Sequence, residues 1–342
     1  SNKFDFTILT SGFTAVTNQF VKDYLEKTLD FISSNKIQMI YYPDFFSLGY
    51  KMKIDKDINH FLNKVAARDT VGQSRAVAHR LVRIIVTIYK VRSIGELLER
   101  INLVLDEINN SYDGQKNSPE IQSLKGMIRE FEEELVWAHY GIGTKNIHHL
   151  RLGFYKGDIF TEVPKRDRDV LPILKQLQEL QPDVISLAFD PEGSGPDTHY
   201  KVLQAIAEAI RLWGKEKDLS ELKIIGYRNV WYRFHPSDAN VFVPVSLNTM
   251  AELDDSFSTC YMTQVDAPFP SYELDGKFST LTQSIWVEQR RMVQLILGKN
   301  YFYSNENPRI RGTHGFVFYK EMKVDEFLSH ARDLANMMEG VI

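Results

Sequence analysis

The sequence contains almost no cysteine and no long apolar run. Cys260 is the only cysteine in 342 residues, which excludes an intrachain disulfide framework and a paired-cysteine metal knuckle. This scarcity is typical of a reducing compartment, and we expect a cytoplasmic protein. No apolar stretch approaches the ~20 residues that cross a bilayer, and the N-terminus lacks the basic and then apolar order of a secretory signal. We therefore expect no membrane partner.

An excess of positive charge and several catalytic motifs are also missing. The formal net charge is −4 and the isoelectric point is near 6.2, so we expect no nucleic-acid partner. The phosphate-loop pattern GxxxxGK[ST] and the nucleophile-elbow pattern GxSxG are both absent. The Gly-Ile-Gly at 141–143 follows a helical pattern instead of a strand, so it is not a dinucleotide-binding turn.

Apolar residues alternate between strand-like and helix-like patterns along the chain. The segments 4–9 and 183–190 read as buried strands, the second being a continuous apolar run typical of a parallel sheet. Helical spacing covers about 15–32, 56–66, 74–92, 94–110, 199–214 and 279–297. This order predicts an α/β fold, a Rossmann-like three-layer α/β/α sandwich with a mostly parallel sheet. We expect one domain over 1–342 with a helical insertion at about 35–115.

The loop at 190–199, Asp-Pro-Glu-Gly-Ser-Gly-Pro-Asp-Thr-His, gathers polar side chains between a predicted strand and a predicted helix. Ligands of open α/β sheets bind beyond the carboxyl ends of the strands. Carboxylate and imidazole groups such as Asp197 and His199 suit zinc-type ions. Alternatively, Asp190 and Asp197 cap the turn and the following helix. The spacing leaves both interpretations open, because the loop supplies at most two of three required ligands.

Four stretches, taken in order, resemble the LmbE/PIG-L family of metal-dependent amino-sugar de-N-acetylases. Residues 180–206 resemble the late motif of that family, an apolar strand, an Asp, a short loop and Pro-Asp-x-His before a helix. The Thr-Ser-Gly end of 8–12, the Arg-bearing helix at 125–141 and the turn at 150–158 are similar to earlier family motifs. The tail at 264–298 is similar to the subgroup fused behind glucosamine-6-phosphate deaminase. The resemblance covers about 8–12 and 120–320.

This resemblance implies hydrolysis of an N-acyl amino sugar with the help of zinc or another divalent metal. His199 would be one metal ligand and Asp197 its catalytic motif partner, while Arg129 would line the site and bind substrate. The fusion implies an amino-sugar or sugar-phosphate substrate in N-acetylglucosamine metabolism, and a fused deaminase domain as partner. The general base would come from a His-Pro-Asp-Asp motif near the N-terminus.

The chain departs from the family pattern in two places. The His-Pro-Asp-Asp motif would precede 8–12 by one strand and one helix, and the sequence starts too late to contain it. Gly195 stands where many members have a histidine that stabilises the oxyanion. We therefore expect a fragment of a longer protein that lacks its first strand, binds metal weakly by itself and hydrolyses nothing.

Two further interpretations remain open, one for the residue His235 and one for the function of the whole chain. The segment His-Pro-Ser-Asp at 235–238 superficially resembles the missing motif but follows the wrong strand, so we expect His235 to line the substrate site and not to bind metal. The other alternative is a non-catalytic domain that binds sugar, or that serves as an oligomerisation or regulatory partner of a fused deaminase. Gly195 and the helical insertion favour it, and a homo-oligomer fits either class.

Overall fold

The computed structural model describes residues 3–112, 114–157, 161–190, 197–228, 232–265 and 276–338. The chain divides into two compact units, which are described separately below. Unit 1 consists of Ser1–His149 and Ser256–Ala267, and unit 2 consists of Leu150–Asp255 and Pro268–Ile342. The prediction of one domain with an insertion at about 35–115 stays a prediction. The helices of that range belong to unit 1.

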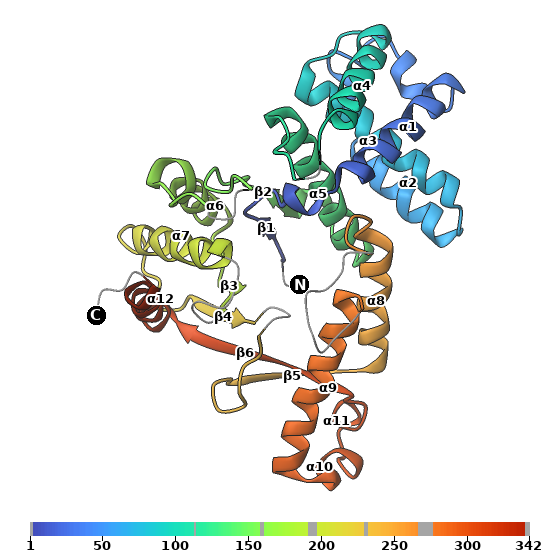
Figure 1. The fold of residues 1–342 in the computed structure, drawn as a ribbon. Helices are drawn as coiled ribbons and strands as arrows, with labels where there is room; N and C mark the ends of the chain where they lie inside the picture. Colours follow the sequence, from blue (N-terminus) through green and yellow to red (C-terminus); the bar gives the residue numbers. More distant parts are fainter. Residues whose placement is uncertain are drawn as a thin grey trace. The chain divides into compact units, whose positions relative to one another are not determined.

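Unit 1 is mainly helical and carries one short pair of strands (Figure 1). Its elements are β1 (Phe6–Ile8), η1 (Phe13–Ala15), α1 (Asn18–Ser33), η2 (Gln38–Tyr41), η3 (Gly49–Lys51), α2 (Asp55–Ala66), α3 (Thr70–Tyr89), α4 (Ile94–Asn109), α5 (Pro119–His139), η4 (Thr144–Asn146) and β2 (Ile147–His149). Helix α3 packs against α1, α2, α4 and α5, which places it in the centre of the helical group. The core of unit 1 runs through these helices and includes the fully buried Cys260.

Local sequence signals fix where several of these helices begin. Ser118 caps α5 by accepting a hydrogen bond from the Ile121 N–H, and Pro119 occupies the first helical turn. Asp69 caps α3 in the same way through the Gly72 N–H. These caps satisfy N–H groups that would otherwise lack partners at the helix ends.

Strands β1 and β2 of unit 1 run parallel, with Phe6 paired to Ile147 and Ile8 paired to His149. The chain leaves β1 through Ser11 and Gly12, and Gly12 adopts a left-handed φ of 60° that favours glycine. Helix α5 lies directly against this turn, because a Cβ on Gly126 would approach the Ser11 Cβ to 3.1 Å. The Thr-Ser-Gly segment thus packs on the Arg-bearing helix.

Unit 2 combines a four-stranded sheet with helices (Figure 1). Its elements are the π-helical turn η5 (Arg166–Val170), α6 (Leu171–Leu180), β3 (Val184–Ala188), α7 (Asp197–Trp213), β4 (Lys223–Tyr227), β5 (Val241–Val245), most of α8 (Leu247–Cys260), α9 (Phe278–Leu297), α10 (Lys299–Tyr303), α11 (Pro308–Arg311), β6 (Gly315–Lys323) and α12 (Val324–Met338). Helix α7 packs on α6 and α12, α12 contacts β4 and β6, and α9 runs along β6.

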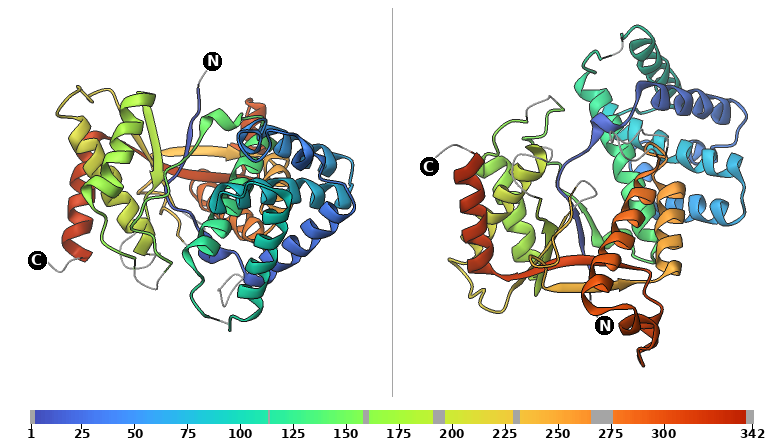
Figure 2. Two further views of the ribbon diagram at one scale, coloured as in Figure 1. Left: turned by 90° about the horizontal axis from the view of Figure 1, so that it is seen from above. Right: turned by 60° about the horizontal axis from the view of Figure 1, so that its bottom comes forward.

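The sheet of unit 2 is mixed. Its strand order is β3-β4-β6-β5, with β3 and β4 parallel. The strand β6 runs antiparallel to both of its neighbours, and Figure 2 shows the long β6 beside β5. In the described chain, the pairs β1–β2 and β3–β4 are parallel, and the pairs β4–β6 and β5–β6 are antiparallel. Parallel pairing is therefore less frequent than the sequence suggested. The chain is a mixed α/β protein, and the Rossmann-like three-layer sandwich stays a prediction.

No helix within the described ranges is both long and apolar enough to span a bilayer.

Candidate functional site

The predicted loop of unit 2 begins at the end of β3 and leads into α7. The backbone N–H of Phe189 donates to the Tyr227 carbonyl at 2.7 Å, so the parallel pairing of β3 with β4 extends to the residue before Asp190. Helix α7 begins at Asp197, two residues before His199. Residues 191–196, including Gly195, lie outside the described part of the chain. The described ends of the loop carry Asp190 and His199.

Asp190 and His199 contact each other across this loop. The Asp190 carboxylate is 8% exposed, and its Oδ2 lies 2.7 Å from the His199 Nδ1. The His199 side chain is 37% exposed, so the imidazole is at the surface while its carboxylate partner is buried. A carboxylate at Nδ1 favours the tautomer in which Nε2 is the coordinating nitrogen. This is the arrangement by which proteins orient a metal-binding or proton-transferring histidine.

Asp197 has a different set of partners. Its Oδ2 accepts hydrogen bonds from the Lys201 Nζ at 2.6 Å, the Thr161 Oγ1 at 2.6 Å and the Thr161 N–H at 3.3 Å. Burial by itself would raise the pKa of Asp197, but the hydrogen bonds from Lys201 and Thr161 outweigh it and lower that pKa. Asp197 is therefore a stably ionised carboxylate that ties the start of α7 to the segment at 161.

The fully buried Asp169 binds backbone groups on both sides of Thr161 in the sequence. This carboxylate accepts hydrogen bonds from the Phe154 N–H at 3.1 Å and the Lys165 N–H at 2.7 Å, and from the Arg168 guanidinium at 2.9 Å. Burial would raise the pKa of Asp169, yet Arg168 and these backbone donors lower it. Asp169 thus joins the backbone at Phe154 to the segment Lys165–Arg168 within unit 2. The sequence contained no signal for this role, since Asp169 sits in an ordinary run of alternating charges.

Arg129 belongs to α5 of unit 1 and binds groups of its own unit. Its Nη1 donates to the Glu132 carboxylate and to the Thr263 Oγ1, the second at 3.2 Å. The Glu132 side chain is fully buried and also accepts from the Thr263 N–H at 2.6 Å. The Arg129 guanidinium lies over the Tyr261 ring, 5.0 Å from its centroid. The predicted substrate-binding Arg129 therefore anchors the segment at 261–263 to α5.

His235 lies in an exposed turn of unit 2 between β4 and β5. Its Nδ1 is 2.7 Å from the Ser237 Oγ, and the Ser237 N–H also donates to it at 3.3 Å. Pro-Ser-Asp after a strand is common turn chemistry, and these bonds close such a turn. The structure thus brings Asp190 to His199 and Thr161 to Asp197, but among the described residues the hydrogen bonds of His235 stay within its own turn.

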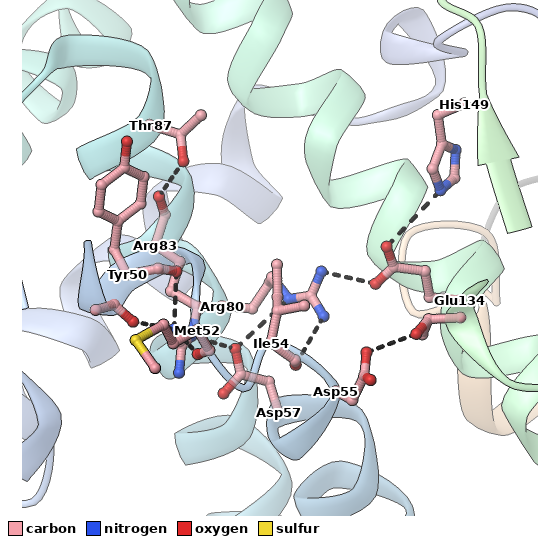
Figure 3. Close-up of polar contacts among 12 residues, drawn as sticks. Tyr50, Met52, Ile54, Asp55, Asp57, Arg80, Arg83, Thr87, Glu134 and His149 are labelled. Carbon is pink, nitrogen blue, oxygen red and sulfur yellow. Dashed lines mark hydrogen bonds and ion pairs between the residues drawn. The ribbon is translucent and has the colours of Figure 1, made fainter.

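A second charged cluster lies inside unit 1 (Figure 3). Asp57 of α2 is 2% exposed, and its Oδ2 lies 2.7 Å from the Arg83 Nε and 3.6 Å from the Arg80 Nε of α3. Arg80 also donates to the Glu134 Oε2 of α5 at 2.7 Å. Burial raises the pKa of Asp57 to about 6, although both arginines oppose this shift. Glu134 in turn lies 3.8 Å from the His149 Nε2 at the end of β2.

The role of this cluster is structural. The Arg83 Nη1 donates to three backbone carbonyls of the segment between α1 and α2, those of Gly49, Tyr50 and Met52. Its guanidinium therefore binds backbone carbonyls in and directly after η3, while Asp57 neutralises the charge. The cluster joins α2, α3 and α5.

Neither unit contains a complete metal centre in its described part. No group of three or more His, Cys, Asp or Glu side chains with metal-binding geometry occurs among the residues that the structure covers. The pair of Asp190 and His199 provides one imidazole ligand and one orienting carboxylate, whereas catalytic zinc sites use three protein ligands. The described residues alone thus do not complete a zinc site.

Comparison with known proteins gives one match that bears on function. A curated protein of Bacteroides thetaiotaomicron, named as a glucosamine-6-phosphate deaminase-like protein, is 28% identical over 162 residues. The match covers 46% of this chain and 24% of that relative, so it spans about a quarter of the relative's length. No protein-family model matches the chain, and no solved structure matches it. The chain is therefore distantly similar to a protein whose name refers to amino-sugar metabolism.

Proposed function

We propose that this chain is an amino-sugar N-deacetylase domain of the LmbE/PIG-L type, which removes the acyl group from an N-acyl amino sugar with the help of a divalent metal. Unit 2 would carry the metal-binding residue, and the larger protein would work in N-acetylglucosamine metabolism together with a glucosamine-6-phosphate deaminase domain. The observation that carries the proposal is the 2.7 Å contact between the buried Asp190 and His199 beyond the carboxyl end of β3. The similarity to a deaminase-like protein supports the pathway.

Each site residue has a definite part in this proposal. His199 would hold the metal through Nε2, and Asp190 would fix the orientation of the ring and raise its basicity. The remaining ligands and the general base would come from the His-Pro-Asp-Asp motif of the family, which does not occur within residues 1–342. A bound divalent metal polarises the acyl carbonyl and lowers the pKa of a bound water. Asp197 is the carboxylate that the family motif assigns to catalysis, and its bonds to Lys201 and Thr161 support a positioning role at the start of α7.

Arg129 and His235 remain proposed substrate contacts. A guanidinium can bind a hydroxyl or phosphate of the sugar, and an exposed imidazole can donate to a sugar hydroxyl. The Arg129 Nη1 already donates to the Glu132 carboxylate, and this bond would fix the plane of the guanidinium before the substrate binds. This is the preorganisation that binding sites need.

Metal titration tests the proposal directly. The full-length protein to which we propose this chain belongs is dialysed and titrated with Zn²⁺ by calorimetry, and its acetate release from N-acetylglucosamine 6-phosphate is then measured in the zinc-loaded state. We expect His199→Ala to weaken zinc binding at least tenfold, and Asp190→Asn to weaken it by about 10- to 100-fold through loss of the orienting carboxylate. His314→Ala is the matched control, because His314 is also an exposed histidine of unit 2 and its Nδ1 contacts only its own turn at Gly312.

If His199→Ala binds zinc as tightly as the parent protein, His199 is not a metal ligand, and the proposed metal site and deacetylase activity are both contradicted. Zinc binding that depends on His199 without any acetate release would instead support the non-catalytic alternative, a sugar-binding or regulatory partner of a deaminase. Acetate release that is lost in His199→Ala and kept in His314→Ala would establish the enzyme.

A further inference from the structure

The end of helix α9 in unit 2 exposes a run of apolar side chains. Leu295, Ile296 and Leu297 are the last three residues of α9, and they are 87%, 70% and 49% exposed. Tyr301 and Tyr303 of the next helix, α10, are 39% and 66% exposed. Single exposed apolar residues are common on protein surfaces, whereas a group of them marks a site of interaction.

The structure fixes this apolar group in place. Helix α10 packs on α9 and α11 (Figure 1). Phe302 of α10 is fully buried, and the Arg290 guanidinium of α9 lies over its ring, 4.6 Å from the centroid. The Arg290 Nε also donates to the Thr313 carbonyl at 2.7 Å. The Arg311 Nη1 of α11 donates to the Asn305 carbonyl at 2.6 Å. The exposed apolar residues therefore belong to a packed part of unit 2 and not to a frayed helix end.

Positive charge flanks the apolar group. Residues 290–311, which we call the α9 tip, contain five arginines or lysines and one acidic residue, so the tip has a net charge of +4 in a chain of net charge −4. Arg291, Lys299 and Arg309 are exposed, and in the described part of the chain none of them lies within ion-pair distance of a carboxylate. Two copies of this tip would repel each other, so its occupant has to combine apolar surface with negative charge.

The directions of the three aliphatic side chains favour lipid over a folded protein as this occupant. Successive residues of a helix are about 100° apart, so Leu295, Ile296 and Leu297 extend over about 200° of the circumference of α9. A protein that binds one side of the helix covers only part of this arc, whereas lipid can surround all of it. Tyrosine at the level of the headgroups and basic side chains that attract anionic lipid are common at membrane surfaces.

We propose that the α9 tip binds the surface of an anionic lipid bilayer. Leu295, Ile296 and Leu297 insert among the headgroups, while Arg291 and Lys299 contact the negative groups of the lipids. Insertion is shallow, because the carbonyls of the last turn of α9 need the water of the headgroup region. The prediction of no membrane partner was based on the lack of a spanning run and of a secretory signal, and surface binding requires neither. The proposed deacetylase activity is not needed for this binding.

Co-sedimentation with vesicles tests the proposal. Purified full-length protein is mixed with vesicles of phosphatidylcholine, with or without phosphatidylserine, and the bound fraction is measured after centrifugation. We expect binding to the vesicles that contain phosphatidylserine, and weaker binding as salt is added. Leu295→Ser combined with Ile296→Ser should weaken the binding at least about tenfold, since two inserted aliphatic side chains are lost. Val71→Ser combined with Leu103→Ser is the matched control, because these residues are 63% and 47% exposed on α3 and α4.

The basic residues of the tip are tested in the same assay. Arg291→Gln combined with Lys299→Gln should weaken binding to the phosphatidylserine vesicles by about fivefold for each charge at low salt. The effect should shrink at high salt, where the surface charge of the lipid is screened. Lys175→Gln combined with Lys215→Gln makes the same change in net charge at two other exposed positions of unit 2 and should leave the binding unchanged.

Three results would overturn the proposal. The first is a parent protein that stays in the supernatant with the phosphatidylserine vesicles. The second is an equal loss of binding in the tip variants and in their controls, because the contact would then not lie at the tip. The third is self-association in analytical ultracentrifugation that Leu295→Ser with Ile296→Ser abolishes, without vesicle binding by the parent, which would identify the tip as a protein interface.

Discussion

Asp190 and Asp197 stand at the two ends of one loop, yet they serve different partners. Asp190 is buried against His199, while Asp197 binds Lys201 and Thr161. The sequence motif singles out Asp197, because it is only two residues from the histidine. In a helix, residues two apart point in different directions, so the nearer residue is not the one that contacts the imidazole. The distant Asp190 reaches His199 because the strand end and the helix start converge.

The pairing of Asp197 predicts a specific dependence of stability on pH. The folded-state pKa of Asp197 is lowered, so its stabilising contribution is present above the unfolded pKa and is lost as pH falls through the folded pKa. Asp197→Asn should lower the free energy of unfolding at pH 7 by up to about 1 kcal/mol, since the side chain is partly exposed and its ion pair is screened. Urea denaturation at pH 7 and at pH 3 measures the difference, which should shrink at the lower pH.

A second ion pair on the same helix provides the control for this prediction. Glu208 and Arg211 of α7 contact each other at 2.6 Å, with the arginine side chain 55% exposed. Glu208→Gln should change the stability less than Asp197→Asn, because among the residues that the structure covers Glu208 bonds only to Arg211 of its own helix. An equal loss in both variants would mean that the bond to Thr161 contributes nothing beyond the local pair.

At the scale of elements, the sequence predicted most of the helices but only part of the sheet. Patterns at 56–66, 94–110 and 279–297 became α2, α4 and α9 with nearly the same bounds, because each is a long amphipathic segment. The strand β6 and the helix α12 were not predicted, and β6 is the strand that makes the sheet of unit 2 mixed. Parallel pairing was inferred from strand–helix alternation and from the continuous apolar run at 183–190. That inference cannot detect a late strand that enters the sheet antiparallel between two earlier ones.

Close packing of β4 gives a prediction at this scale. A Cβ on Gly226 would lie 2.8 Å from the Phe189 Cβ and 2.9 Å from its Cγ, so the ring packs directly on the glycine. Gly226→Ala should lower the free energy of unfolding by about 1–3 kcal/mol, because Phe189 has to move within a buried cluster. Thermal or urea unfolding of the purified variant provides the measurement.

Gly143→Ala is the matched control for Gly226→Ala. Gly143 precedes η4 with φ −74° and ψ 149°, a conformation open to alanine, and nothing lies within 4 Å of its added Cβ. This variant should be as stable as the parent, or more stable by up to about 1 kcal/mol. If the two variants have the same free energy of unfolding, Phe189 accommodates the added methyl group without loss of stability, which contradicts the prediction.

At the scale of the whole molecule, the chain builds two cores. The core of unit 1 is formed by α1 to α5, and the returning segment at 256–267 contributes Cys260 to it. Unit 2 buries its own large side chains, Trp213 and Phe327 among them. The sequence predicted one domain with a helical insertion, and its hydrophobic patterns could not show which helices share a core. Such patterns show that a helix has an apolar face, but not which other face covers it.

Because each unit has its own core, we expect a core substitution in one unit to destabilise that unit and not the other. Phe131 of α5 is 1% exposed in unit 1, and Phe327 of α12 is fully buried in unit 2. Each Phe→Ala change should cost about 3–5 kcal/mol through lost burial and the cavity that remains. Hydrogen exchange read peptide by peptide should show lost protection in α1–α5 for Phe131→Ala, and in β3, β4, α7 and α12 for Phe327→Ala. If either variant loses protection equally in both sets of peptides, the two units unfold as one cooperative structure and the division into two cores carries no energetic meaning.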